Sequence, residues 1–500
     1  MKMRRRSVTA LAATGLAWAA GLAGAQPQAQ ARKDNVVLGM VLEPTGLDPT
    51  IAPAAAIGEI VHYNVLEGLT KVNVDGSVTP LLAESWSLSP DGRVYTFKLR
   101  RGVKFQDGEP FDAAAVKFSL DRARAEGSTN KNKKGVFDNI SAVATPDAAT
   151  VAVTLKNPDG NFLFRMGEST AVILSPKSAA TAATQPMGTG PFRFAEWKKG
   201  ASVSLVRWDG FRNVAAIKLR RVTFRFINEP AAQVAAMLAG DVDGFPRFDL
   251  QSWRRFQNDK RFSVVLGSTA GKGILAVNNK RKPFDDVRVR RALMHAIDRK
   301  AFIDGVLDGQ ARPIGSHAAP TDLGYVDLSG QYPYDPEKAR ALLKEAGVAI
   351  PLVVTLTLPP PQYARKGGEV IAAQLANVGI QARIENVEWA QWLAGAFKGN
   401  FDLTIINHVE PLDFMVYADS KYYFGYDSLA YRDLTARYAA AAESKERLRL
   451  FGDIQRMLAL DAVNAFIFNP AQVALARKGL KGLWANSPIF ANDMAAVSWQ

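Results

Sequence analysis

The side chains that most often carry catalysis or metal binding are scarce in this sequence. Cysteine is absent, which excludes disulfides, thiolate ligands, a cysteine nucleophile and a lipidated N-terminal cysteine. The chain has only four histidines, which are His62, His295, His317 and His408. No two have the spacing of a metal-ligand pair, and no His-Glu-x-x-His motif or Gly-x-Ser-x-Gly elbow occurs. The sequence therefore predicts no catalytic residue, no metal site and no cofactor.

Two short motifs that could do chemistry have simpler structural explanations. The Gly-Thr-Gly segment at 188–190 could open a phosphate-binding loop, but Pro191 follows at once and nothing completes the motif. We expect a tight turn there that enters a strand at 192–197. The acidic pair at 285–286 precedes an expected helix around 290–297, where carboxylates cap and stabilise a helix N-terminus.

A more informative pattern surrounds one expected strand, 401–406. It follows expected strands at 352–358 and 380–387 in alternation with helices, an order that favours a largely parallel sheet with right-handed crossovers. Ligands of such sheets bind beyond the carboxyl ends of the strands, where this chain carries Asn407 and His408. Aromatic residues are frequent on both sides of this point. Core packing is the commoner role of any one of them, but the group suits a cleft for an amphipathic organic ligand.

The N-terminal segment has the features of an export signal. A basic head at 2–6 is followed by an Ala-rich apolar stretch at 8–22 and a small-x-small site at 23–25. This pattern predicts a signal peptide over residues 1–25, cleaved near Ala25, and a periplasmic chain that is not lipidated. Both the Sec and the twin-arginine routes stay open.

Length and composition are those of a large globular protein. The 500 residues are enough for two or three domains. Hydrophobic residues make up 48% and charged residues 22%, which argues against disorder and against a polytopic membrane protein. The formal charge is +14, but the basic residues are scattered and form no recognisable nucleic-acid-binding module. We therefore expect no nucleic-acid partner.

A series of motifs runs in order along the chain. It includes Pro-Leu-Leu-Ala-Glu-Ser-Trp, Tyr-Thr-Phe-Lys-Leu-Arg and Gly-Val-Lys-Phe-Gln-Asp-Gly in the N-terminal third. The full series occupies segments 47–49, 80–86, 89–92, 95–100, 102–108, 188–191, 283–293, 296–299, 334–339 and 342–347. Together these motifs resemble the signature of ABC-importer solute-binding proteins of the peptide/nickel class, family 5, from about residue 35 to the C-terminus.

The resemblance implies an α/β fold of a two-lobed periplasmic binding protein. This is the type II architecture of the large class, with an extra small domain, mixed sheets and a hinge of two crossover strands. The implied domains are a discontinuous lobe I at 26–75, 186–272 and 478–500, the small domain at 76–185 and lobe II at 273–477. The hinge strands are expected near 273–278 and 473–477.

The resemblance also implies a function. The chain would be the extracytoplasmic substrate-binding subunit of an ABC importer and not an enzyme. It would capture a peptide or a similarly sized organic solute between its lobes and deliver it, as a monomer, to a membrane permease with its ATPase. Relatives with this fold carry dipeptides, longer peptides, opines, glycans, haem and metal chelates, so the ligand stays open. The alternatives are a secreted hydrolase and a chaperone-like binding module on the same scaffold.

The resemblance finally implies ligand-binding residues. Peptide-binding members hold the ligand's amino group with an aspartate, and aligning Glu410-Pro411 on the family's acid–proline pair places Asn407 there. An ungapped register from the preceding strand places Pro411 there instead, so the usual aspartate is missing either way. Glu410 or Asp413 could substitute, although either acid could equally be a surface or helix-cap residue. The remaining candidates are Trp389, which matches a ligand-packing position, His408, and Glu43 at the end of the expected first strand.

Overall fold

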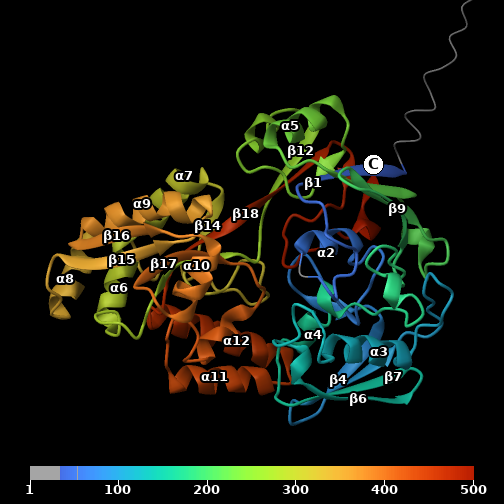
Figure 1. Ribbon diagram of the computed structural model, residues 1–500, viewed down its shortest axis with the longest axis horizontal. Coiled ribbons are helices and arrows are strands. Elements are labelled where there is room, and N and C mark those ends of the chain that lie inside the picture. The colour runs from blue at the N-terminus through green and yellow to red at the C-terminus, as the bar shows by residue number, and fades with distance from the viewer. Residues whose placement is uncertain (1–33, 53) are drawn as a thin grey trace, which may run out of the picture.

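The computed structural model describes residues 34–52 and 54–500 and shows two lobes joined by crossing strands (Figure 1). The predicted signal peptide, residues 1–25, and its cleavage site near Ala25 lie outside the described residues. In the described part of the chain, no helix combines the length and the apolar character that a membrane span needs. The predicted two-lobed α/β architecture with mixed sheets is confirmed.

Lobe II, at the left of Figure 1, is a sheet covered by helices on both faces. Its strands are β13 (Lys272–Val277), β15 (Leu352–Leu358), β16 (Ile380–Asn386) and β17 (Leu403–His408). Its helices are α6 (Val287–Ala296), α7 (Arg299–Leu307), α8 (Pro336–Glu345), α9 (Gln362–Ala376), α10 (Trp389–Ala394), α11 (Leu429–Ala440) and α12 (Ser444–Leu460). Successive residues of β13 enter opposite cores: Leu275 packs with α6–α9, and Ile274 with α10–α12. This alternation is the period-two pattern of a strand buried on both faces.

The structure corrects the predicted end of one strand in this sheet. β15 pairs in parallel with β16 and β17, as the sequence predicted, but β17 reaches His408 instead of ending at Ile406. The two extra residues belong to the strand because antiparallel β13 pairs Asn407 with Gly273 and His408 with Lys272. Asn407 and His408 are therefore held by a ladder of backbone hydrogen bonds and do not lie on a free loop.

Lobe I, at the upper right of Figure 1, continues the same 12-stranded sheet. Its strands are β1 (Asn35–Met40), β8 (Phe192–Lys198), β9 (Ser202–Arg207), β10 (Arg221–Phe226) and β11 (Gly244–Phe245). β1 lies between β10 and β11 and is parallel to both. Helix α2 (Ala55–Val61) packs with β1 in one core, and helix α5 (Pro230–Ala239) packs in another. The C-terminal strands β19 (Leu480–Lys481) and β20 (Ser498–Trp499) pair with each other in this lobe.

A small domain lies below lobe I and beside the end of lobe II (Figure 1). It is a four-stranded antiparallel sheet in the order β4 (Ala83–Leu88), β5 (Val94–Leu99), β7 (Thr150–Leu155), β6 (Ile140–Asp147). Helices α3 (Ala113–Arg124) and α4 (Phe162–Arg165) contribute to its separate hydrophobic core. Short strands β2 (Thr70–Val72) and β3 (Val78–Pro80) precede it along the chain.

The lobes are joined where two strands cross from one half of the sheet to the other. β12 (Phe262–Ser268) leads into β13, and β18 (Ala465–Arg477) pairs with β13 near its start and with β12 and β11 near its end. The two strands therefore cross between the lobes at 268–272 and 469–472. The hinge strands expected from the resemblance, near 273–278 and 473–477, begin a few residues later in the chain. The fully buried Asn469 side chain ties the two strands together by donating hydrogen bonds to Thr269 O at 2.8 Å and Gly271 O at 2.7 Å.

A buried histidine makes the stability of this fold sensitive to acid. His62, at the end of α2, is fully buried and stacks on Tyr63 with ring centroids 3.9 Å apart. Neither ring nitrogen has a hydrogen-bond partner. Burial, helped by the nearby Lys71 ammonium, lowers the pKa of His62 to about 3. The unfolded chain therefore binds a proton between about pH 6.5 and pH 3 that the folded chain does not, and stability falls as the pH falls through that range.

We predict that His62→Phe reduces this acid sensitivity. From pH 7 to pH 5, protonation of His62 in the unfolded chain should cost the wild type about 2 kcal/mol of unfolding free energy, a cost that phenylalanine avoids. Urea unfolding at the two pH values measures the difference. An equal loss of stability in wild type and variant would show that His62 titrates normally in the folded protein.

Candidate functional site

The loop after β17 borders the small domain and lobe I. Val409, Glu410 and Pro411 form one wall of a cavity of about 70 Å³. The opposite walls come from lobe I and the small domain and include Pro49, Ala55, Lys131, Arg165, Glu168 and Phe490. Ala55 and Phe490 also line a second cavity of about 300 Å³ on lobe I, which Arg247 and Glu59 border. The smaller cavity lies where elements from three parts of the chain meet, and we refer to the two adjoining cavities together as the interlobe cleft.

A buried lysine fixes the position of this loop. Lys272 lies on β13, and its side chain is 1% exposed. Its ammonium donates hydrogen bonds to Glu410 O and to Asp413 Oδ1, both at 2.6 Å. Between these two acceptors the chain turns at Leu412, whose φ of 52° is uncommon for a residue other than glycine. The lysine thus ties the first strand of lobe II directly to the loop at the cleft.

Two histidines complete the shell around the Asp413 carboxylate. His317 Nε2 lies 3.0 Å from Asp413 Oδ1, and His408 Nδ1 lies 3.3 Å from Asp413 Oδ2. Burial alone would raise the pKa of Asp413, but the Lys272 ammonium and the two imidazoles hold it well below its usual range. Burial lowers the pKa of His317 to about 4, so this ring is neutral at neutral pH. The cluster is a buried ion pair in contact with two imidazole rings.

The same three side chains have the geometry of a metal-ligand set. Ligand atoms of His317, His408 and Asp413 all lie within 4.8 Å of one another. The Lys272 ammonium, however, already lies against this carboxylate. The remaining ring nitrogens are hydrogen-bonded to tyrosine hydroxyls, His317 to Tyr417 at 3.0 Å and His408 to Tyr423 at 2.9 Å. Lysine therefore supplies the positive charge that a metal ion would bring.

The cleft is lined by pairs of opposite charges. Lys131 Nζ of the small domain lies 3.6 Å from Glu410 Oε1 of lobe II, so this pair spans the cleft. Arg165 Nη1 lies 3.3 Å from Glu168 Oε2. On lobe I, Arg247 pairs with Glu59 and also donates to Gln472 Oε1, on crossing strand β18, at 3.3 Å. The cleft can therefore offer cations to a carboxylate and carboxylates to an ammonium group.

The structure places the lobe II candidates at different depths. The Glu410 side chain is half exposed and lines the cleft, whereas Asp413 is buried in the lysine–histidine cluster behind it. His408 is buried in the same cluster. Asn407 contributes its backbone N–H to Tyr363 Oη at 3.1 Å, and its side-chain oxygen is buried without a hydrogen-bond partner. The predicted residues 407–413 are thus brought together, and among them only Glu410 presents a charge to the cleft.

The other two candidates lie apart from these residues. Trp389 begins α10, is 42% exposed and packs edge-on against Trp392 with ring centroids 5.7 Å apart. It does not line either cleft cavity. Glu43 accepts hydrogen bonds from Trp197 Nε1 at 2.8 Å and Gly200 N at 3.0 Å, which fix the β8–β9 hairpin of lobe I. A role for either residue in binding stays a prediction.

Sequence reasoning missed several residues of the cleft. Lys131, Arg165 and Arg247 lie in segments without a recognisable motif, and no local signal distinguishes them from surface charges. Lys272 did carry a signal, because it directly precedes an apolar stretch at 273–277 in the same strand. A lysine in such a position is seldom buried without a charged or hydrogen-bonding partner.

Comparisons with known proteins identify the class of this chain. Residues 77–423 match the family model of the bacterial extracellular solute-binding proteins, family 5. The glutathione-binding protein GsiB of Salmonella choleraesuis is 33% identical over 369 residues, which cover 73% of this chain and 71% of the relative. The chain therefore belongs to the family 5 solute-binding proteins. It is the substrate-binding subunit of an ABC importer, as the motif series implied.

Solved structures agree on the fold. The periplasmic murein tripeptide-binding protein MppA, in its unliganded open form, aligns with a TM-score of 0.82 at 23% identity, over 93% of this chain and 97% of that one. The periplasmic binding protein DppA of Helicobacter pylori, in complex with the peptide STSA, aligns with a TM-score of 0.73 at 25% identity, over 94% and 99%. Both alignments extend over both lobes and the small domain.

We predict that Lys272→Met destabilises the protein by about 3–5 kcal/mol, because it leaves the Asp413 charge buried without its counter-ion. The double variant Lys272→Met/Asp413→Leu should recover a large part of this loss, since it removes both charges. Urea unfolding followed by circular dichroism measures the free energies.

Arg281→Met is the matched control for this prediction, because Arg281 pairs with Asp402 at the surface of the same lobe with half of its side chain exposed. Removing an exposed partner should change stability far less. A Lys272→Met variant as stable as Arg281→Met would contradict the proposed role of the buried pair.

Proposed function

We propose that this chain binds a zwitterionic, peptide-sized solute in the interlobe cleft. The observation that carries the proposal is the set of acid–base pairs lining the cleft, above all Lys131–Glu410. Both side chains of this pair are more than 40% exposed, and their charged atoms are 3.6 Å apart. Such a pair contributes only about 0–1 kcal/mol. Breaking this pair therefore costs little free energy, and a ligand's ammonium and carboxylate can form charge-assisted hydrogen bonds with the two side chains instead.

Glutathione is the first ligand to test. Relatives that are one-third identical are named glutathione-binding proteins, and their similarity extends over most of this chain. Glutathione carries one ammonium group and two carboxylates. Glu410 is suited to the ammonium, and Lys131 and Arg165 are suited to the carboxylates, because these residues face one another across the cleft. This assignment gives Glu410 the role that an aspartate has in the peptide-binding members.

Hinge closure is the mechanism that this architecture supports. A ligand that contacts Glu410 on lobe II and Lys131 or Arg165 on the other side stabilises only arrangements in which both walls are close. We infer that the closed, loaded form docks on a membrane permease and that the chain works in the periplasm, after removal of residues 1–25.

The side-chain chemistry supports binding without turnover. A hydrolase of the serine type needs a hydroxyl nucleophile hydrogen-bonded to a histidine, which an acid in turn orients. The acid–histidine half is present as Asp413 with His317 and His408. In the described residues, however, the hydroxyls on these rings belong to Tyr417 and Tyr423, in the buried cluster. Neither ring has a serine or threonine partner.

We predict that Glu410→Gln weakens the binding of reduced glutathione by about tenfold or more, because the ammonium group loses a charged acceptor. Isothermal titration calorimetry on residues 26–500 measures the affinity. Glutathione acetylated on its amino group should bind the wild type about as weakly as glutathione binds the variant.

Glu385→Gln is the control, because Glu385 is exposed on β16 and does not line the cleft. It should bind glutathione like the wild type. Equal affinities for Glu410→Gln and Glu385→Gln would remove Glu410 from the site. A wild type that binds neither glutathione nor any di- or tripeptide would contradict a zwitterionic ligand altogether.

A further inference from the structure

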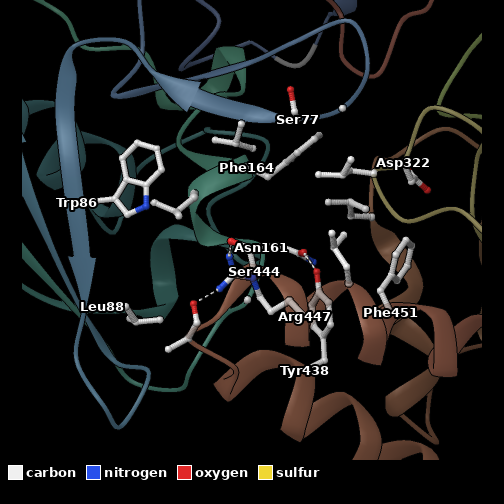
Figure 2. A pocket seen from close by; sticks show the side chains of 18 of the residues that line it. Ser77, Trp86, Leu88, Asn161, Phe164, Asp322, Tyr438, Ser444, Arg447 and Phe451 are labelled. Atoms are coloured by element: carbon white, nitrogen blue, oxygen red, sulfur yellow. Dashed lines mark hydrogen bonds between the residues drawn. The ribbon is translucent and has the colours of Figure 1, made fainter.

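A larger cavity lies on the far side of the cleft loop. Its volume is about 380 Å³, within the usual range for small-molecule sites. One wall comes from the small domain and the other from lobe II, chiefly α11 and α12 (Figure 2). This cavity shares no lining residue with the cleft. The boundary runs between adjoining residues: Phe164 and Leu412 face the larger cavity, whereas Arg165 and Pro411 face the cleft.

The lining has the composition of a binding site for an apolar group. The apolar side chains around it include Trp86, Leu88, Phe164, Leu323, Leu448 and Phe451. Figure 2 shows aromatic residues at opposite sides of the space, with Trp86 from β4 and Phe451 from α12. Leu323 is 47% exposed and Leu448 is 38% exposed. Covering such side chains with an apolar ligand is favourable in proportion to the area removed from water.

A guanidinium group supplies the polar end of this cavity. Arg447 donates from Nη1 to Ala441 O at 2.9 Å and Ala442 O at 2.8 Å, and from Nη2 to Ser444 Oγ at 3.1 Å. These acceptors hold the side chain in place beside Ser444 (Figure 2). Arginine has five N–H donors, so two remain for a ligand. Among the described residues, Arg447 has no carboxylate partner at salt-bridge distance.

Two further carboxyl groups lie near this cavity and are the groups that would oppose an anion there. Asp322 belongs to the lining, and its carboxylate accepts a hydrogen bond from Ala319 N at 2.8 Å. Burial raises the pKa of Asp322 to about 6 and also raises the pKa of Asp159, which precedes the lining residue Gly160. Tyr438 and Asn161, both in the lining, form a neutral hydrogen bond from Tyr438 Oη to Asn161 Oδ1 at 2.6 Å.

We propose that this cavity is a second ligand site, distinct from the interlobe cleft, for a small amphipathic carboxylic acid. The apolar body of the ligand lies between the small domain and lobe II, and its carboxylate pairs with the free N–H groups of Arg447. Because the walls belong to two parts of the chain, the bound ligand holds the small domain against α11 and α12. Its occupancy therefore affects how easily the lobes move relative to each other.

Titration calorimetry with 4-phenylbutyrate tests the proposal, with 4-phenylbutanol as the uncharged probe of similar shape. The wild type should bind the acid at least about tenfold more tightly than the alcohol, because only the acid forms a charged hydrogen bond. Arg447→Gln should abolish this difference while it still binds the alcohol. Equal binding of the two probes by the wild type, or no binding of the acid at millimolar concentration, would overturn the proposal.

Two cavity-filling variants locate the binding. Leu448→Trp and Leu323→Trp fill the space from different segments of lobe II, and each should weaken binding of the acid by about tenfold or more. Leu460→Trp is the control, because Leu460 is also on α12, is 50% exposed and lies outside the lining. Thermal unfolding verifies that each variant is folded. If both cavity-filling variants bind the acid as tightly as Leu460→Trp does, the acid binds elsewhere and the proposal fails.

Discussion

The ion pair between Lys272 and Asp413 fixes the loop by which lobe II borders the cleft. An ammonium and a carboxylate buried together are costly to desolvate, so such a pair persists only with good geometry and further hydrogen bonds. Here the ammonium also binds Glu410 O, and the carboxylate also meets His317 and His408. The pair sets the path of the loop and leaves the Glu410 side chain at the surface of the cleft.

The two sides of the cleft meet in one pair of opposite charges, Lys131 and Glu410. On one side, β13 and β17 hold Glu410 through Lys272, and on the other, the small domain and lobe I carry Lys131, Arg165 and Arg247. The crossing strands join these two sides, and Asn469 binds the two strands to each other at the crossing point. A zwitterionic ligand can replace the weak Lys131–Glu410 pair by two ion pairs of its own, one to each side of the cleft. Ligand binding is then coupled to closure of the lobes. The cavity beside Arg447 lies at the other contact between these two sides, where a second ligand would influence the same motion.

Local sequence patterns predicted most of lobe II, because its strands and helices follow short-range rules. β15 was expected at its observed residues, and β16 ends within a residue of its prediction. The end of β17 was predicted two residues too early, since its pairing with β13 depends on residues more than 130 positions away. The cluster around Asp413 was unpredictable for the same reason: Lys272, His317 and His408 meet only once the strand register is fixed. Glu410 was proposed from the family motif, whereas Lys131, Arg165 and Arg247 lie in segments without a motif.

Small-angle X-ray scattering during titration with reduced glutathione tests most directly whether the cleft closes on a zwitterionic ligand. Closure should lower the radius of gyration of the wild type, with saturation at one ligand per chain. Glu410→Gln should need about tenfold more ligand for the same change. An unchanged radius of gyration at a glutathione concentration that saturates binding in calorimetry would contradict closure of the cleft on its ligand.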